Sequence, residues 1–155
     1  MTTPYTDLPD SAFWRRSVAA PAASKVDPVG PVPFQIRASD QVMTAGSCFA
    51  QHIARYMRRC GLDPMVTEPV HPLLSPAQAE GWNYGTFTAR YGNLYVARQL
   101  LQLLQRAYGR FTPAEDQWHT EDGSLLDPFR PQIQPGGFAS LPEFTRDRQQ
   151  HFAAV

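Results

Sequence analysis

The chain has 155 residues, of which 43% are hydrophobic, and this is enough for one domain with a core of its own. Its 14 basic and 14 acidic side chains cancel, which argues against a nucleic-acid or membrane-surface protein because both need a basic field. No apolar run approaches the ~20 residues of a spanning helix, and the N-terminus lacks signal-peptide features. We therefore expect a cytoplasmic protein with neither a membrane nor a nucleic acid as partner.

The 15 prolines are about double the usual number, and many of them lie in residues 1–33 and 128–142. Proline favours extended connections over helix or central strand, so we expect long ordered loops or an incomplete fold. Residues 1–33 are interpreted as an N-terminal arm with one or two helical turns near 11–18. Residues 34–155 are interpreted as part of a single domain.

A strand–helix–strand order is predicted next. Residues 41–45 are expected to form a short buried strand, and residues 63–68 a second one. Between them, residues 48–60 predict an amphipathic helix, and this order favours a parallel sheet with crossover helices. The apolar positions expected to be buried in this helix are Phe49, Ile53, Met57 and Cys60.

The two cysteines, Cys48 and Cys60, would lie about 18 Å apart on that helix. A disulfide needs Cα atoms within about 7 Å, so we expect both thiols to be reduced. Burial of Cys48 as a small hydrophobe is favoured over a reactive thiol.

Three further helices and a hairpin follow. Ser75 and Pro76 suit the start of a short helix over 75–80, and residues 93–109 predict a longer one. Asp122-Gly123 indicates a tight turn between two short strands. Ser140 and Glu143 have capping-box spacing, and we expect the chain to stop within or just after the helix they begin. The apolar faces predicted for the two longer helices are Ala97, Leu100, Leu101, Leu104 and Tyr108, and Leu141, Phe144, Phe152 and Val155.

Ser47 is the candidate nucleophile. It lies where an extended segment turns into a helix, so backbone N–H groups and the helix dipole favour negative charge beside it. The same position suits a plain helix cap or a phosphate-binding turn. The local pattern by itself leaves these three alternatives open.

Residues 46–50, Gly-Ser-Cys-Phe-Ala, resemble the signature of the GSCFA family, whose relatives are the SGNH (GDSL-like) hydrolases. The resemblance continues through the stretches 83–88, 90–95, 98–101 and 127–131. It implies an α/β fold, a three-layer sandwich with a mostly parallel sheet that is incomplete in this chain. It also implies ester hydrolysis or acyl transfer without a cofactor or metal, on an acylated small molecule such as a carbohydrate ester.

The resemblance assigns the nucleophile to Ser47 and the oxyanion donors to Gly85 and Asn83, together with the Ser47 N–H. Gly92 and Asn93 form a competing pair of oxyanion donors. Asn83 has an alternative role as a turn residue, and Asn93 as a helix N-cap.

The sequence lacks the motif that would supply a general base for Ser47. The SGNH families use a histidine in an Asp-x-x-His arrangement, which this sequence lacks. Asp147 and His151 are four apart and are interpreted as a partly solvated helix pair. We therefore expect the 155 residues alone to be inactive, with a non-catalytic binding module or a phosphate or nucleotide binder at Ser47 as alternatives.

Overall fold

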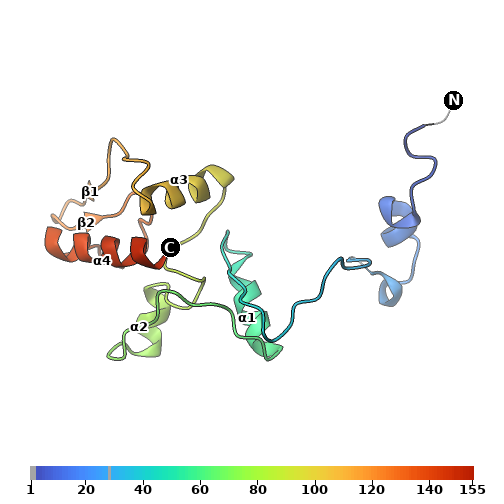
Figure 1. Ribbon diagram of the computed structural model, residues 1–155, viewed down its shortest axis with the longest axis horizontal. Coiled ribbons are helices and arrows are strands. Elements are labelled where there is room, and N and C mark those ends of the chain that lie inside the picture. Colours follow the sequence, from blue (N-terminus) through green and yellow to red (C-terminus); the bar gives the residue numbers. More distant parts are fainter. Residues whose placement is uncertain (1–2, 28) are drawn as a thin grey trace. The chain divides into compact units, whose positions relative to one another are not determined.

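The computed structural model describes residues 3–27 and 29–155. The chain divides into an N-terminal unit, Met1–Arg37, and a C-terminal unit, Ala38–Val155, near the boundary expected from the sequence. Described residues of the N-terminal unit form three short helical segments, η1 (Asp10–Ala12), η2 (Arg15–Ala19) and η3 (Ala23–Lys25) (Figure 1). The helical turns expected near residues 11–18 are therefore present.

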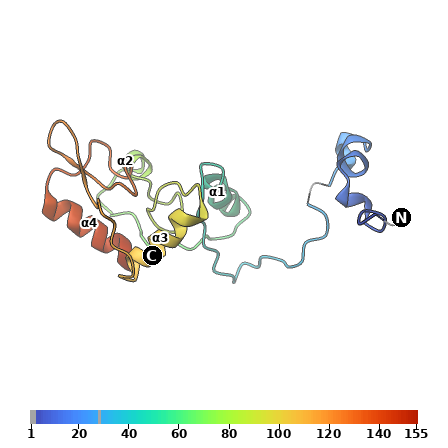
Figure 2. The same ribbon diagram turned by 90° about the horizontal axis from the view of Figure 1, so that it is seen from above.

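The C-terminal unit contains all four predicted helices, of which α1, α3 and α4 are shorter than expected and α2 is shifted by one residue. The observed bounds are α1 (Gln51–Arg59), α2 (Pro76–Gly81), α3 (Ala97–Ala107) and α4 (Leu141–Ala154). The Ser75 hydroxyl caps α2 by accepting from the Gln78 N–H at 3.3 Å, and Ser140 caps α4 in the same way. Helices α3 and α4 contact each other and lie side by side in two views (Figures 1 and 2).

The predicted hairpin is confirmed. Strands β1 (Trp118–His119) and β2 (Leu125–Leu126) pair antiparallel and are the only strands within the described residues. The turn closes by a bond from the Gly123 N–H to the Thr120 carbonyl, at 3.0 Å, with Gly123 at φ 86°. Glycine adopts this left-handed conformation without steric cost, which is why Asp122-Gly123 predicts the turn correctly.

The two segments that flank α1, residues 41–45 and 63–68, contain no strand, so both predicted strands are wrong, and only Thr44 is buried within the first of them. Single backbone hydrogen bonds join them to each other and to the segment around Thr88. The donors and acceptors are Met65 N to Val42 O (3.0 Å), Thr88 N to Thr44 O (3.2 Å) and Thr67 N to Thr88 O (2.9 Å). The predicted strand–helix–strand order is therefore not formed around α1, and the parallel sheet stays a prediction.

The predicted buried faces of α1 and α3 are largely wrong, whereas in α4 Phe144 is buried and Phe152 and Val155 are half-buried, with only Leu141 exposed. In the helix predicted over 48–60, Met57 is buried as expected, but Phe49 is 84% exposed and Ile53 is half exposed. Both cysteines are exposed and unpaired, so burial of Cys48 is also wrong, whereas the absence of a disulfide is confirmed. Leucines of the predicted α3 stripe are exposed too, and Leu103 with Arg106 takes the buried side of that helix.

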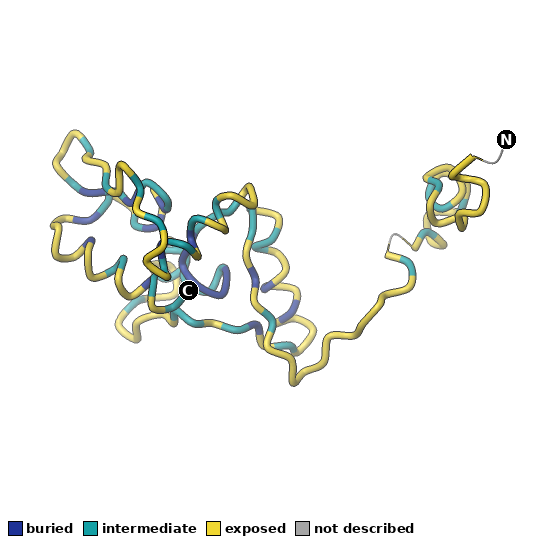
Figure 3. Tube along the Cα trace, turned by 45° about the horizontal axis from the view of Figure 1, so that its top comes forward, coloured by how far each residue is buried: buried dark blue, intermediate teal, exposed yellow. Residues whose placement is uncertain are grey.

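The apolar faces of these helices are not buried as predicted because charged side chains occupy much of the interior. Two small apolar clusters form around Phe87, Tyr91 and Leu103 and around Phe138 and Phe144. Figure 3 shows that buried residues occur in short runs of the trace, and that only a few positions along each helix are buried. The buried polar side chains of this unit are Thr44, Thr88, Arg90, Arg106, Asp127, Arg130 and His151.

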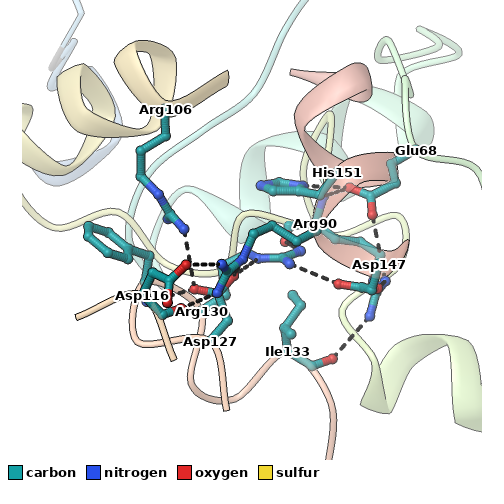
Figure 4. Close-up of polar contacts among 11 residues, drawn as sticks. Glu68, Arg90, Arg106, Asp116, Asp127, Arg130, Ile133, Asp147 and His151 are labelled. Carbon is teal, nitrogen blue, oxygen red and sulfur yellow. Dashed lines mark hydrogen bonds and ion pairs between the residues drawn. The ribbon is translucent and has the colours of Figure 1, made fainter. Parts of the chain in front are cut away.

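Asp147 joins two of these buried arginines (Figure 4). Its two carboxylate oxygens accept from Arg90 Nη1 at 2.7 Å and from Arg130 Nη2 at 2.8 Å. Arg90 also donates to the backbone carbonyls of Trp82 (2.9 Å) and Ile133 (3.2 Å). The interpretation of Asp147 and His151 as a partly solvated pair is therefore wrong, because each of them binds buried partners on other segments.

Replacing Asp147 by Asn is expected to destabilise the C-terminal unit by about 3 kcal/mol, since two buried guanidinium groups lose their shared carboxylate. The matched control is Asp116→Asn, which breaks an ion pair with Arg148 at a half-exposed aspartate and should cost less than about 1 kcal/mol. Urea unfolding followed by circular dichroism measures both. Equal losses for the two variants would show that the buried bridge adds nothing beyond a surface pair.

Candidate functional site

The Ser47 turn lies one helical turn before α1. Gly46 adopts φ 147°, the Ala50 N–H donates to the Ser47 carbonyl at 2.9 Å, and α1 begins at Gln51. The N-cap of α1 is Ala50 and no side chain caps this helix, so the role of Ser47 as the cap of α1 is wrong. Ser47 is half-buried, and its hydroxyl has no hydrogen-bond partner among the described residues.

The segment Thr88–Leu94 binds the backbone that leads into this turn. Before the turn, the Thr44 N–H donates to the Thr88 hydroxyl at 2.8 Å and the Thr44 carbonyl accepts from the Tyr91 hydroxyl. After Tyr91, the Leu94 N–H donates to the Gly46 carbonyl at 2.8 Å. These bonds fix the backbone that carries Ser47, although the two segments lie more than forty residues apart in the sequence.

Asn93 is brought beside the start of α1. Its Oδ1 accepts from Gln51 Nε2 at 2.9 Å, so its Nδ2 has no partner within the described residues and can donate elsewhere. A hollow of about 230 Å³ adjoins Gly46 and is closed by the residues that follow Asn93, from Leu94 to Ala97. An asparagine amide and an open space are thus both available next to the Ser47 turn.

Gly85 and Asn83, the oxyanion donors expected from the resemblance, make other contacts. The Gly85 carbonyl accepts from Arg58 Nη2 at 3.2 Å, at the end of α1 that is remote from Ser47. Asn83 adopts φ 60° and donates from Nδ2 to the Gln132 carbonyl at 3.3 Å. Of the two candidate pairs, Gly92 and Asn93 directly precede Leu94, whose N–H binds the Gly46 carbonyl.

A second cavity, of about 490 Å³, lies between α3, α4 and the loop of residues 128–133. Asn93, which accepts a hydrogen bond from Gln51 at the start of α1, also lines this cavity. We call it the α3–α4 cavity. Its polar walls include Gln99, Gln102, Arg106, Arg130 and His151.

His151, which the sequence predicted in a partly solvated helix pair, is a buried residue of the cavity wall. It is 1% exposed, and its Nδ1 lies 2.9 Å from Glu68 Oε2 (Figure 4). Burial lowers the pKa of His151, and the hydrogen bond to Glu68 opposes this only in part. For Glu68, burial raises the pKa, but His151 and Arg90 outweigh it and the pKa ends below its usual value. At neutral pH the pair is therefore a carboxylate and a neutral imidazole.

The described residues contain no group of three metal-ligating side chains, and no helix among them is long and apolar enough to cross a membrane. The model of the GSCFA family matches residues 41–153 of the chain. The chain belongs to the GSCFA family. Searches of curated proteins and of solved structures found no match.

The match places the features described above within one GSCFA domain. It begins just before the Ser47 turn, includes Glu68 and the segment 88–94, and ends inside α4 after His151. The resemblance seen in the sequence is thus confirmed at the level of the family. The N-terminal unit lies before the match.

Gly46→Ala is expected to destabilise the GSCFA domain by about 2 kcal/mol, because φ 147° strains any side-chain-bearing residue. The added Cβ would also approach the Ala50 Cβ to 2.8 Å. Gly81→Ala is the matched control, since a Cβ added at Gly81 would meet nothing within 4 Å and the variant should be neutral or slightly stabilising. If thermal unfolding gives the same midpoint for both variants, the tight turn at Ser47 is not required.

The pH dependence of the free energy of unfolding should reflect the protonation of His151. Its pKa is lower in the folded than in the unfolded state, where it is about 6.5, so the unfolded state binds more protons as the pH falls below that value. The free energy of unfolding should therefore decrease between pH 7 and pH 5. The slope should be smaller in His151→Asn and unchanged in His52→Asn, whose side chain is exposed. If the free energy of unfolding changed with pH equally in wild type and in His151→Asn, the lowered pKa of His151 in the folded state would be contradicted.

Proposed function

We propose that this GSCFA protein hydrolyses or transfers an ester-linked acyl group, with Ser47 as the nucleophile. The observation that carries the proposal is the Ser47 turn itself, which bears the family signature. Its hydroxyl is unengaged, its backbone is held by the segment Thr88–Leu94, and a hollow adjoins Gly46. A free serine hydroxyl on a backbone that is held by hydrogen bonds suits attack on a carbonyl carbon.

In this reaction Ser47 Oγ bonds to the carbonyl carbon while its proton passes to a general base, a group that no described residue supplies within hydrogen-bond reach of Ser47 Oγ. The leaving alcohol takes a proton as its C–O bond breaks, and water or a second alcohol then releases the acyl group from Ser47. We assign the oxyanion donors to the Ser47 N–H and Asn93 Nδ2, which is left free because Asn93 Oδ1 accepts from Gln51. The contacts of Asn83 and Gly85 with Gln132 and Arg58 favour a structural role for that pair.

We also propose that the domain follows the three-layer α/β sandwich with a mostly parallel sheet. The order of extended segments on either side of α1, and the single backbone bonds that join them to the segment around Thr88, support this fold. The substrate on this proposal is an acylated small molecule, with a carbohydrate ester as the first choice.

A non-catalytic binding module is the second candidate. It is favoured by one observation: no described histidine hydrogen-bonds to the Ser47 hydroxyl. A module of this kind would keep the turn and the cavities but would not form an acyl intermediate.

A fluorophosphonate probe distinguishes the two candidates in the full-length protein. We expect labelling in wild type, none in Ser47→Ala and full labelling in Ser17→Ala, whose hydroxyl bonds only within the N-terminal unit. Among the oxyanion candidates, Asn93→Ala should lower kcat on p-nitrophenyl esters by about 10²-fold, and Asn83→Ala by far less. Absence of labelling in folded wild type would instead favour the binding module.

A further inference from the structure

The side chain that the proposed chemistry leaves unused is His151. Its Nδ1 is bound to Glu68, whereas its Nε2 is buried and has no hydrogen-bond partner among the described residues. Buried polar atoms are nearly always satisfied, so an orphan nitrogen needs a reason. His151 also lines the α3–α4 cavity, so a ligand held in that cavity lies next to its ring.

Glu68 decides what kind of group the nitrogen can bind. The carboxylate also accepts from the Arg90 N–H at 2.7 Å, and Arg90 Nη1 lies 3.6 Å away, so it is held as an anion. An ionised carboxylate can only accept, which requires Nδ1 to carry the proton of the neutral imidazole. Nε2 is then a hydrogen-bond acceptor, and the group that satisfies it must be a donor such as a hydroxyl.

The cavity walls favour a neutral ligand with several hydroxyl groups. None of the lining residues is an Asp or Glu. The amide oxygens of Asn93 and Gln99 already accept hydrogen bonds within the protein, so these two amides offer donors, while Gln102 offers both a donor and an acceptor. The two lining arginines are already paired: Arg130 binds Asp127 at 3.1 Å and Asp147 at 2.8 Å, and Arg106 lies 3.8 Å from Asp127. Because these carboxylates offset the arginine charges, little positive charge remains for an anion.

The size and the apolar walls are consistent with such a ligand. A volume of about 490 Å³ lies within the range of small-molecule sites, and the Phe129 and Tyr91 rings provide flat apolar surfaces. Arg106 lies over the Phe129 ring at 3.9 Å, so this part of the wall is rigid.

We propose that the Glu68–His151 pair is a binding site for a polyol: His151 Nε2 accepts a hydrogen bond from one hydroxyl of a sugar-sized ligand in the α3–α4 cavity. Glu68 acts as the positioning residue because it fixes the proton on Nδ1. The site does not require Ser47 to be a nucleophile, so it can be correct whether or not the proposed ester chemistry is.

The test is nitrogen-15 NMR of the histidine side chains in the full chain at pH 7. We expect His151 to be neutral with the proton on Nδ1. Titration with D-glucose, D-galactose, D-mannose and myo-inositol up to about 0.1 M, which fills even a millimolar site, should shift the Nε2 resonance for at least one of them. Ser47→Ala should leave that titration unchanged, which separates this site from the proposed esterase function.

His151→Asn is the informative variant, because an asparagine amide can still donate to Glu68 but offers no acceptor at the position of Nε2. Its affinity for the responding polyol should fall about tenfold, while His52→Asn should not change it. The wild-type titration is decisive should His151→Asn fail to fold. A proton on Nε2, no response to any of the four polyols, or a response to inorganic phosphate alone would overturn the proposal.

Discussion

The folded GSCFA domain depends on the two hydrogen-bonded ion pairs of the Asp147 carboxylate. This carboxylate bridges Arg90 and Arg130, and through them it connects α4 to the segment Thr88–Leu94 and to the loop that follows β2. Apolar burial is divided between two small clusters, so these charges occupy the space that a hydrophobic core fills in most domains of this size. Burying charge is costly unless it is paired, and here each guanidinium group has both a carboxylate and a backbone carbonyl as acceptors.

The same segment serves two purposes. Arg90 anchors it to the charged interior, and within four residues Thr88, Tyr91 and Leu94 bind the backbone that carries Ser47. The geometry of the Ser47 turn is therefore tied to α4 through a chain of hydrogen bonds. Asn93 extends this connection, because it accepts a hydrogen bond from Gln51 at the start of α1 and also lines the cavity that His151 lines.

Local signals in the sequence predict the elements well. The caps at Ser75 and Ser140 and the glycine of the hairpin act within a few residues, and the structure confirms each of them. The buried faces could not be predicted from apolar periodicity, because the partners of Arg90 and His151 lie 57 and 83 residues away. One signal was present: His151 follows Phe144 by seven residues, which places both on the same face of α4. The choice between Asn83 and Asn93 likewise depends on the contacts of Gln51 and Gln132, which sequence spacing does not reveal.

The exposure of Cys48 has a practical consequence for enzymology. Its thiol is open to solvent and directly follows Ser47 in the turn that precedes α1. Alkylation by iodoacetamide would add bulk beside the serine and could block substrate entry sterically. Inactivation by a thiol reagent would therefore be no evidence for a cysteine nucleophile, and a Cys48→Ser background would be the appropriate starting point for covalent labelling at Ser47.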